Sequence, residues 1–502
     1  MMGMSKRTSR RIGKALHGFV TLVSSASIVL SSFTASFAQA IIVDPSAPGT
    51  SFLQTSNGTP QVDIKTPQSG VSLNRFIEFN VGPNGLILNN STTSGVSVIG
   101  QNVTANPNLM VSGPASTIVT EVTGTAPTSM TGKTEVFGKK AAVIVANPNG
   151  IVCNGCAFLN AKSSTLTTGK PIVSGSRVDL AVTKGTVTIG PAGFQPGAQG
   201  GIIGRHVILT GPVVTSGQGP ANDLLVSGGA QRVQGLNGSD LSASPIVAAP
   251  STTAKASPFA IDAAETGTLR GGDVVIRNPE AGQGVNLYGV TDGRSLSATS
   301  GGNLFYKDID TDGAASLAGS EVRQYGRLIA GGDVTIIGRA FTLYDGRVIE
   351  TAGDITITGE EFVVIAGEVS GDNVRLDVTN GTLTNTGFLM ADGDLTVIAG
   401  ENVSQQRQIA REYDTSFDPA LQQYIQAYYA QLAAGGPEAD LAAQMIARAS
   451  RHELVAEYIE KGATATGTNV SITADGDISN EGGAVAATRD VRLEAGASII
   501  NT

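Results

Sequence analysis

The chain of 502 residues contains no tryptophan, and aromatic residues make up only 5% of it. Charged residues account for 15%, well below the quarter that is usual in soluble proteins. A chain with so few large and charged side chains is poorly suited to one large globular core. The 64 glycines instead favour many short strands joined by tight turns, as in extended repeat architectures.

The N-terminus has the pattern of a cleaved export signal. Basic residues between positions 6 and 14 precede an apolar, serine-rich stretch at 18–37, and Ala38-Gln39-Ala40 offers small residues for cleavage. The serines and threonines in this stretch disfavour the alternative of a membrane anchor. We therefore expect residues 1–40 to be a signal peptide and the mature chain to start at Ile41.

Removal of that signal makes the chain more acidic. It takes away five basic residues and no acidic ones, so the formal net charge changes from −9 to −14 (−9 − 5). An acidic exported protein is not expected to bind nucleic acid, and we exclude that class of partner.

A repeated unit of Gly, then Asp or Asn, then alternating apolar residues fills much of the second half. Copies start at Gly272, Gly302, Gly332, Gly353 and Gly393, with weaker ones at Asn373, Asn469 and Asp490, mostly 19 to 30 residues apart. Stacked about 4.8 Å apart, such short strands bury a continuous apolar column. The pattern predicts an all-β parallel β-helix, since the leucine ladder of leucine-rich repeats and the boundaries of separate β-sandwiches are missing.

The repeat stops between Glu401 and Gly462. Asp418-Pro419 is typical of a helix start, apolar residues follow at helical spacing to Leu432, and Gly435-Gly436-Pro437 ends the pattern. A second helical stretch runs from Leu441 to Ile459. We therefore predict an α-helical insertion at 403–462, helical from about residue 405. Packing on the solenoid and service as a partner-binding arm are both compatible with it.

Two similar turn motifs occur in the first half of the chain. They are Asn106-Pro107-Asn108-Leu109 and Asn147-Pro148-Asn149-Gly150, the second followed by Ile151. Proline, asparagine and glycine in this order favour type I-like turns. The motifs lie 41 residues apart, about twice the repeat period, so in a solenoid they would occupy the same corner two rungs apart. Each motif alone is also compatible with an ordinary turn.

The order of motifs around these turns resembles the N-terminal secretion domain of the filamentous haemagglutinin family. The matching blocks are Gly70-Val71-Ser72-Leu73-Asn74, Phe79-Asn80-Val81, Gly85-Leu86-Ile87-Leu88-Asn89-Asn90, Asn106-Pro107-Asn108-Leu109, Glu135-Val136-Phe137-Gly138, Ala146-Asn147-Pro148-Asn149-Gly150-Ile151 and Phe158-Leu159-Asn160. The likeness covers about the first 230 mature residues. It departs from the family at Thr104-Ala105, which replaces a glycine-rich run, and at 211–260, which is rich in Pro, Ser and Ala and matches poorly.

The resemblance implies a domain plan and a function. It implies a two-partner secretion domain at 41–235, a connection at 236–260, right-handed β-helix repeats at 261–402, and further, incomplete repeats at 463–502. A dedicated outer-membrane β-barrel transporter would recognise the domain with periplasmic modules, and the two turns would be required for secretion. The product would be an adhesin or toxin-delivery protein on or outside a Gram-negative cell, acting on a host or neighbouring-cell receptor.

The two cysteines follow the second turn as Cys153-Asn154-Gly155-Cys156. In a chain sent to an oxidising compartment, we expect a disulfide here, and family members with this spacing look similar. A redox site would usually lie in a thioredoxin-like βαβ unit, which is absent. A zinc site needs four ligands, but only His206 and His452 accompany the cysteines in the mature chain.

Two other possibilities are open. Asp308, Asp310 and Asp312 alternate as in a calcium loop, but Gly319 stands where a bidentate glutamate belongs, so an ordinary loop is the main expectation. Parallel β-helices also include polysaccharide-cleaving enzymes, the alternative function. Sparse aromatic residues and acidic residues at repeat turns disfavour a catalytic groove, so we expect neither an enzyme nor a cofactor.

Overall fold

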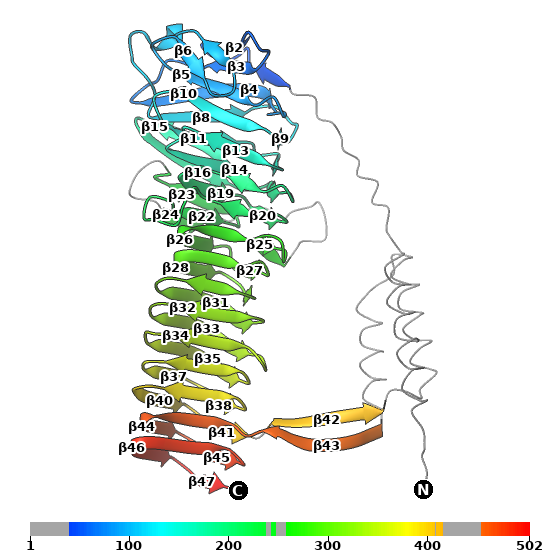
Figure 1. The fold of residues 1–502 in the computed structure, drawn as a ribbon, viewed down its shortest axis with the longest axis vertical. Helices are drawn as coiled ribbons and strands as arrows, with labels where there is room; N and C mark the ends of the chain where they lie inside the picture. Colours follow the sequence, from blue (N-terminus) through cyan, green and yellow to red (C-terminus); the bar gives the residue numbers. More distant parts are fainter. Residues whose placement is uncertain (1–39, 237–241, 247–257, 407, 415–452) are drawn as a thin grey trace, which may run out of the picture. The chain divides into compact units, whose positions relative to one another are not determined.

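A computed structural model of the chain describes residues 40–236, 242–246, 258–406, 408–414 and 453–502. Most of its strands belong to one parallel β-solenoid, in which each strand pairs with a strand one coil earlier and one coil later. Strand β33 (Val334–Leu343), for example, lies between β31 (Ala315–Gln324) and β35 (Ile355–Ile365). Figure 1 shows the coils following one another in chain order. The parallel β-helix predicted from the repeats is confirmed.

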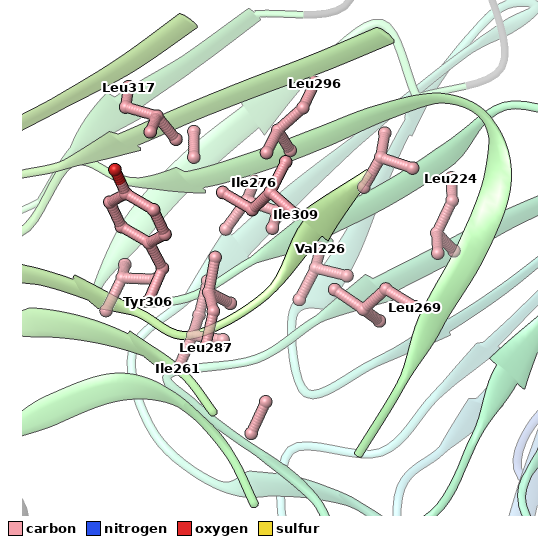
Figure 2. Packing of buried hydrophobic residues seen from close by; sticks show 14 of the residues in the cluster. Leu224, Val226, Ile261, Leu269, Ile276, Leu287, Leu296, Tyr306, Ile309 and Leu317 are labelled. Atoms are coloured by element: carbon pink, nitrogen blue, oxygen red, sulfur yellow. The ribbon is translucent and has the colours of Figure 1, made fainter. Parts of the chain in front are cut away.

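The core is a column of small and medium apolar side chains inside the coils. Along β33 the side chains alternate, with Val334 and Ile336 fully buried and Ile337 49% exposed. Pairing stacks Val334 on Ile355, and Ile355 in turn stacks on Val374. Figure 2 shows similar residues from the middle coils meeting inside. Burial of each Val, Ile or Leu side chain stabilises the fold by about 1.5–3 kcal/mol. The sum over many coils therefore takes the place of one large globular core.

The Gly-Asp units form a column of turns on the outside. The Asp333 carboxylate accepts the amide of Asp354 at 3.0 Å, and the Asp354 carboxylate accepts the amide of Asn373 at 3.2 Å. The Asn373 side chain then accepts the amide of Asp394 at 2.9 Å. In these three coils the Asp or Asn side chain at the turn therefore binds the backbone of the next coil, which is a reason for the repeat to keep Asp or Asn at this position.

The N-terminal coils carry additional antiparallel strands. Strand β1 (Ile41–Val43) pairs with β4 (Val71–Phe79), and β2 (Ser51–Gln54) pairs with β3 (Pro60–Asp63). A hairpin of β6 (Gly95–Ser97) and β7 (Gln101–Val103) lies against the first coils, where Val103 packs with Ile87 and Phe137. A separate sheet contains β15 (Lys170–Ser174), β16 (Arg177–Val182), β23 (Gln231–Gln234) and β24 (Ser242–Pro245).

The predicted helical insertion is wrong wherever the structure describes it. β41 (Val403–Gln406) is a solenoid strand, and β42 (Gln408–Asp414) pairs antiparallel with β43 (Glu453–Lys461). Leu454 and Ile459, assigned to a helix from their spacing, lie in β43, because pairing with β42 outweighs a short helical pattern in a segment rich in β-formers. The predicted helix at 418–435 lies outside the described residues.

Helical structure is rare in the described part of the chain. There the one helix is the 3₁₀ turn η1 (Pro107–Leu109). Accordingly, the described residues include no helix with the length and apolar character to cross a membrane.

Candidate functional site: the two Asn-Pro-Asn turns

The first turn is built around a fully buried asparagine. The Asn106 side-chain oxygen accepts the amide of Asn108 at 2.9 Å, and the Leu109 amide closes the turn on the Asn106 carbonyl at 3.2 Å. The Asn106 side-chain nitrogen donates to the carbonyls of Ile64 and Asn89, at 3.0 and 2.9 Å. Asn106 therefore fixes its own turn and ties it to two distant segments of the chain.

The second turn repeats this arrangement. The Asn147 side-chain oxygen accepts the amide of Asn149 at 2.9 Å, and the Gly150 amide bonds the Asn147 carbonyl at 3.1 Å. The Asn147 side-chain nitrogen donates at 3.0 Å to both the Ala126 carbonyl and the Thr128 hydroxyl, which belong to the preceding coil. Gly150 has a φ of +122°, which suits glycine and little else.

The second asparagine of each motif also reaches another segment. Asn108 donates to the carbonyl of Gly49 at 2.9 Å, and Asn149 donates to the carbonyl of Gly124 at 2.8 Å. Both motifs thus form the hydrogen-bonded turns predicted from their sequence, with the same division of roles. The first asparagine is enclosed, whereas the second lies half-buried at the surface.

The two turns do not share a corner, contrary to the expectation. Asn106 precedes β8 (Thr117–Val122), whereas Asn147 follows β11 (Ala142–Ala146), and β8 pairs with β11. The turns therefore lie at different corners of successive coils. The spacing of 41 residues does not correspond to a whole number of coils, because hairpin β6–β7 occupies residues 95–103 without adding a coil.

Other asparagines of the family-like blocks act in the same way. Asn80, Asn90 and Asn160 each bind the backbone of a neighbouring coil with their side chains. The contacts are Asn80 Oδ1 with the Ser129 amide (2.8 Å), Asn90 Nδ2 with the Ala115 and Lys139 carbonyls (2.9 and 2.8 Å), and Asn160 Nδ2 with the Val136 and Gly138 carbonyls (2.7 and 3.0 Å). These asparagines therefore hold the shape of the N-terminal coils by bonds from their side chains to the backbone of neighbouring coils.

Cys153 and Cys156 are joined by a disulfide, with 5.4 Å between their Cα atoms. Both residues are fully buried in the solenoid core. Cys153 ends β12 (Ile151–Cys153), which lies one coil after β9 (Thr128–Met130). Gly155, between the cysteines, has a φ of +88° and donates its amide to the Gly193 carbonyl at 2.8 Å. The pair closes a tight corner just after the second turn.

The three aspartates of the calcium candidate are not gathered into one site. Asp308 accepts the amide of Arg327 at 2.9 Å, and Asp310 lies exposed in the middle of β30 (Ile309–Thr311). In the part of the chain that the structure describes, no group of three or more His, Cys, Asp or Glu side chains could hold a metal ion. The loop is organised by contacts between coils.

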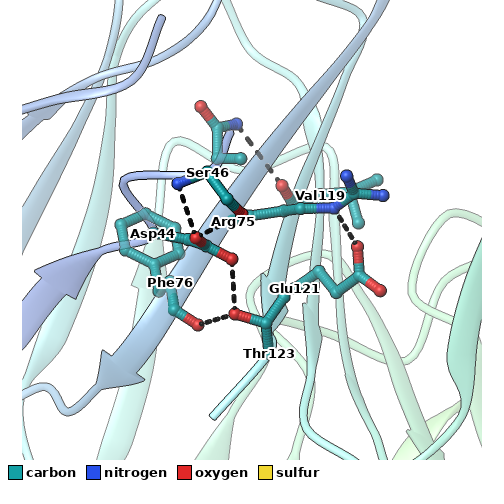
Figure 3. Close-up of polar contacts among 8 residues, drawn as sticks. Asp44, Ser46, Arg75, Phe76, Val119, Glu121 and Thr123 are labelled. Atoms are coloured by element: carbon teal, nitrogen blue, oxygen red, sulfur yellow. Dashed lines mark hydrogen bonds and ion pairs between the residues drawn. The ribbon is translucent and has the colours of Figure 1, made fainter. Parts of the chain in front are cut away.

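Sequence reasoning missed two carboxylates that organise the N-terminal coils. Asp44 accepts the Ser46 hydroxyl at 2.6 Å and the Thr123 hydroxyl at 2.7 Å, as Figure 3 shows. The bond from the Ser46 hydroxyl is the main cause that lowers the pKa of Asp44, and the bond from Thr123 follows. Glu135 is 4% exposed and accepts the Ser97 hydroxyl at 2.6 Å, which fixes hairpin β6–β7. Glu135 belongs to the family-like block Glu135-Val136-Phe137-Gly138, but neither that block nor the sequence around Asp44 predicts the distant partners Ser97 and Thr123.

Fold and site together define a parallel β-solenoid whose first coils carry additional antiparallel strands and are tied by buried asparagine turns. The chain belongs to the TPS secretion domain family, whose model matches residues 39–306, more than half of its length. It is therefore an exoprotein exported by two-partner secretion to the surface of a Gram-negative bacterium. Membership in this family implies a dedicated outer-membrane transporter.

Several known proteins are similar to this chain over more than half of its length. Filamentous hemagglutinin of Bordetella pertussis is 40% identical over 288 residues, covering 56% of this chain and 8% of that protein. The 16S rRNA endonuclease CdiA of Enterobacter cloacae is 35% identical over 352 residues, covering 69% of this chain and 10% of that protein. The crystal structure of the filamentous hemagglutinin secretion domain is 33% identical, covers 69% of this chain and 99% of that one, and has a TM-score of 0.49. The chain thus spans a tenth or less of these curated relatives.

Proposed function

We propose that residues 41–235 are the export module and that periplasmic modules of the transporter recognise the chain through the segment carrying the two turns. The residues concerned are Asn106, Pro107, Asn108, Leu109, Asn147, Pro148, Asn149, Gly150 and Ile151. The observation that carries the proposal is the matched pair of enclosed asparagine turns inside the region of the family match. A repeated device of this kind is built into the part of the chain dedicated to export.

The burial of the two asparagines restricts the stage of export at which the transporter can contact them. Asn106 and Asn147 are 0% exposed, so a transporter cannot touch either side chain once the domain has folded. Contact with them therefore precedes folding, while the chain is extended in the periplasm. After export, the same side chains close their turns on the neighbouring segments.

The test is secretion of Asn106→Ala and Asn147→Ala. We expect each variant to be made at normal levels and to be lost from the culture supernatant, measured by immunoblot of cell and medium fractions. Asn385→Ala is the matched control, because Asn385 is also 0% exposed and its side chain joins adjacent coils, but it lies outside the export module; Asn373→Ala, at an exposed turn, is a second control. Normal secretion of both motif variants would refute the proposal.

A second measurement separates recognition from folding. Urea-unfolded wild-type and variant chains are diluted onto immobilised periplasmic modules of the transporter, and the bound fraction is compared. We expect weaker binding by both motif variants and unchanged binding by Asn385→Ala and Asn373→Ala. Equal binding by all chains would assign the turns to folding outside the cell and not to recognition.

For the protein as a whole, we propose an adhesin or toxin-delivery stalk that meets a receptor on a host or neighbouring cell. The names of the similar proteins, a hemagglutinin and an endonuclease, support this range of roles. We further propose that the residues described here are not catalytic and that no nucleic acid binds them, since the chain is acidic. Polysaccharide cleavage by the secreted protein would contradict the first of these statements and favour the enzyme alternative.

A further inference from the structure

A half-enclosed pocket of about 240 Å³ lies beside the first coils, between the solenoid and the separate sheet that contains β15. Val71 and Leu73 of β4 and Val173 of β15 give it an apolar surface. Lys65 and Arg75 supply positive charge, and no acidic residue belongs to its described lining. The pocket therefore combines an apolar surface with two cations.

The apolar surface is the uncovered end of a larger layer. Val71, Val119 and Val178 pack together where the separate sheet covers the outside of the solenoid. Leu73 and Val173 contact this layer and are only partly buried. The layer thus ends at the pocket, where apolar side chains of both sheets remain available to a ligand.

A further strand is not expected to fill this space. β15 stands at one end of the order β15-β16-β23-β24, so it is an edge strand. Pro171, in the middle part of β15, has no backbone N–H to donate, and a proline on an edge strand disfavours the addition of another strand. A ligand of the size of a side chain suits the pocket better.

Of the two cations, Lys65 is the less compensated. Arg75 donates its Nε to Glu121 at 2.8 Å, as Figure 3 shows, and the nearby Asp44 carboxylate is engaged by two hydroxyls. Among the described residues, no carboxylate pairs with the Lys65 ammonium. Gly49 leaves room for the Lys65 stem, since a Cβ atom there would lie 3.1 Å from Lys65 Cγ. A half-buried cation beside an apolar surface favours a carboxylate as its partner.

The first asparagine turn holds the wall that carries Lys65. The Asn106 and Asn108 side chains both donate to the Ile64 carbonyl, at 3.0 and 3.1 Å. The Thr66 hydroxyl donates to the Asn108 carbonyl at 2.9 Å. The residues on both sides of Lys65 are therefore tied to this turn, so the pocket forms only once the first coils have folded.

We propose that this pocket binds an aliphatic carboxylate, with its chain against Leu73 and Val173 and its charged group at Lys65 and Arg75. Since a cavity of about 150 Å³ holds a benzene molecule, one of about 240 Å³ holds roughly eight to ten non-hydrogen atoms. Two sources offer this chemistry at this size. They are a straight-chain carboxylate of about six to eight carbons and the free C-terminal leucine or isoleucine of a protein chain.

The test uses the full chain purified after export. Straight-chain carboxylates of about four to ten carbons, and short peptides ending in leucine with a free or an amidated C-terminus, are titrated by calorimetry. We expect the strongest binding among free acids at about six to eight carbons. The matching alcohols and peptide amides should bind at least about tenfold more weakly, because they carry no negative charge. Tighter binding of the peptides identifies a protein C-terminus as the ligand, and tighter binding of the free acids identifies a small molecule.

Variants locate the binding in this pocket. Lys65→Met removes the charge but keeps an unbranched stem, so it should weaken binding about tenfold or more. Leu73→Trp fills the apolar part and should abolish binding. Lys133→Met, at an exposed position of β10 (Lys133–Gly138), is the matched control and should bind like wild type. Thermal unfolding without ligand checks that each variant is folded.

Secretion separates this proposal from the one on export. Lys65→Met should be secreted normally, because Lys65 belongs to neither turn, so loss of ligand binding and loss of export are distinguishable. The pocket is refuted as a carboxylate site if no carboxylate binds, or if alcohols and amides bind as tightly as acids. Binding at wild-type strength by Lys65→Met, or by a folded Leu73→Trp chain, would also overturn it.

Discussion

Asp44 holds the first strand of the solenoid in place through bonds that depend on its charge. Its carboxylate accepts the hydroxyls of Ser46 and Thr123, and its amide donates to the Arg75 carbonyl at 3.0 Å. The hydroxyl bonds that its carboxylate accepts, from Ser46 first and then from Thr123, lower the pKa of Asp44 in the folded state. A lowered folded pKa stabilises the protein above the unfolded value of about 3.9, and this contribution is lost as the pH falls through the folded pKa.

We therefore predict that Asp44→Asn lowers the urea midpoint at pH 7 and that the difference from wild type shrinks at pH 3. Asp310→Asn, at an exposed strand position, serves as the control and should match wild type at both values. Urea unfolding followed by circular dichroism measures the effect. An equal decrease in the urea midpoint at both pH values would show that the stabilisation by Asp44 does not depend on the charge of its carboxylate.

The cysteine pair leads to a second prediction for single residues. Intact-mass and peptide analysis of the secreted chain without reductant should find Cys153 and Cys156 linked to each other. Closing so short a loop restricts the unfolded chain modestly, so Cys153→Ala/Cys156→Ala should lower the unfolding free energy by about 2 kcal/mol. Alkylation of both thiols in the untreated protein would contradict the link, and we would then reconsider a redox role.

Single residues were predictable where a local motif marks them. The Asn-Pro-Asn turns and the cysteine pair stand out in the sequence, but the partners of Asn147 at 126 and 128 do not. Asp44 has one partner close in sequence, Ser46, but its other partner, Thr123, is distant in the chain and was not predictable. Long-range contacts of this kind depend on which coils become neighbours, and a period alone does not fix that when an excursion interrupts it.

Among the elements, the antiparallel arm formed by β42 and β43 interrupts one coil without disturbing its register. Asn385 pairs with Gln405, and Phe388 pairs with Thr464, so the coil resumes in place after the arm. In the following coil, Glu481-Gly482-Gly483 alone connects the equivalent strands. A connection of that length is sufficient to close the coil.

We predict that deleting residues 407–461 leaves a folded solenoid. The remaining Gln406-Gly462-Ala463 has the same length as the natural connection in the next coil, so the thermal midpoint should stay within about 2 °C of wild type. Differential scanning calorimetry measures it. A deletion extended to 404–463 removes paired positions of β41 and should destabilise the chain; similar losses in both deletions would mean that the arm supports the stack.

The β42–β43 arm also shows where the spacing of apolar residues fails to predict the type of a secondary-structure element. Strands such as β33 could be predicted from the sequence, because one face is buried and the other is not, and the apolar residues therefore alternate with polar ones. The segment 453–461 contains Leu454, Val455 and Ile459 at a spacing that fits either a helix or a strand, and its partner 408–414 decides between them. Short apolar patterns without a repeat carry too little information for that choice.

At the scale of the whole molecule, low aromatic content and recurring Gly-Asp units were enough to predict a parallel solenoid. The excursions were not predictable, since hairpin β6–β7 and the separate sheet containing β15 and β16 belong to no period. Surfaces that span several coils were not predictable either. Thr299, Ala318 and Ile337, for example, share one outer surface only after the coils have stacked.

The stacking of coils also determines how the molecule responds to force. Backbone hydrogen bonds join one coil to the next, as from Val334 to Ile355 and on to Val374, so they run parallel to the direction in which the coils stack. Tension along that direction is carried by every layer in series, and we expect the end coil, which has a neighbour on one side only, to separate first. Each freed coil of about 20 residues extends by roughly 70 Å, so a tethered chain lengthens in steps and absorbs work before its attachment fails.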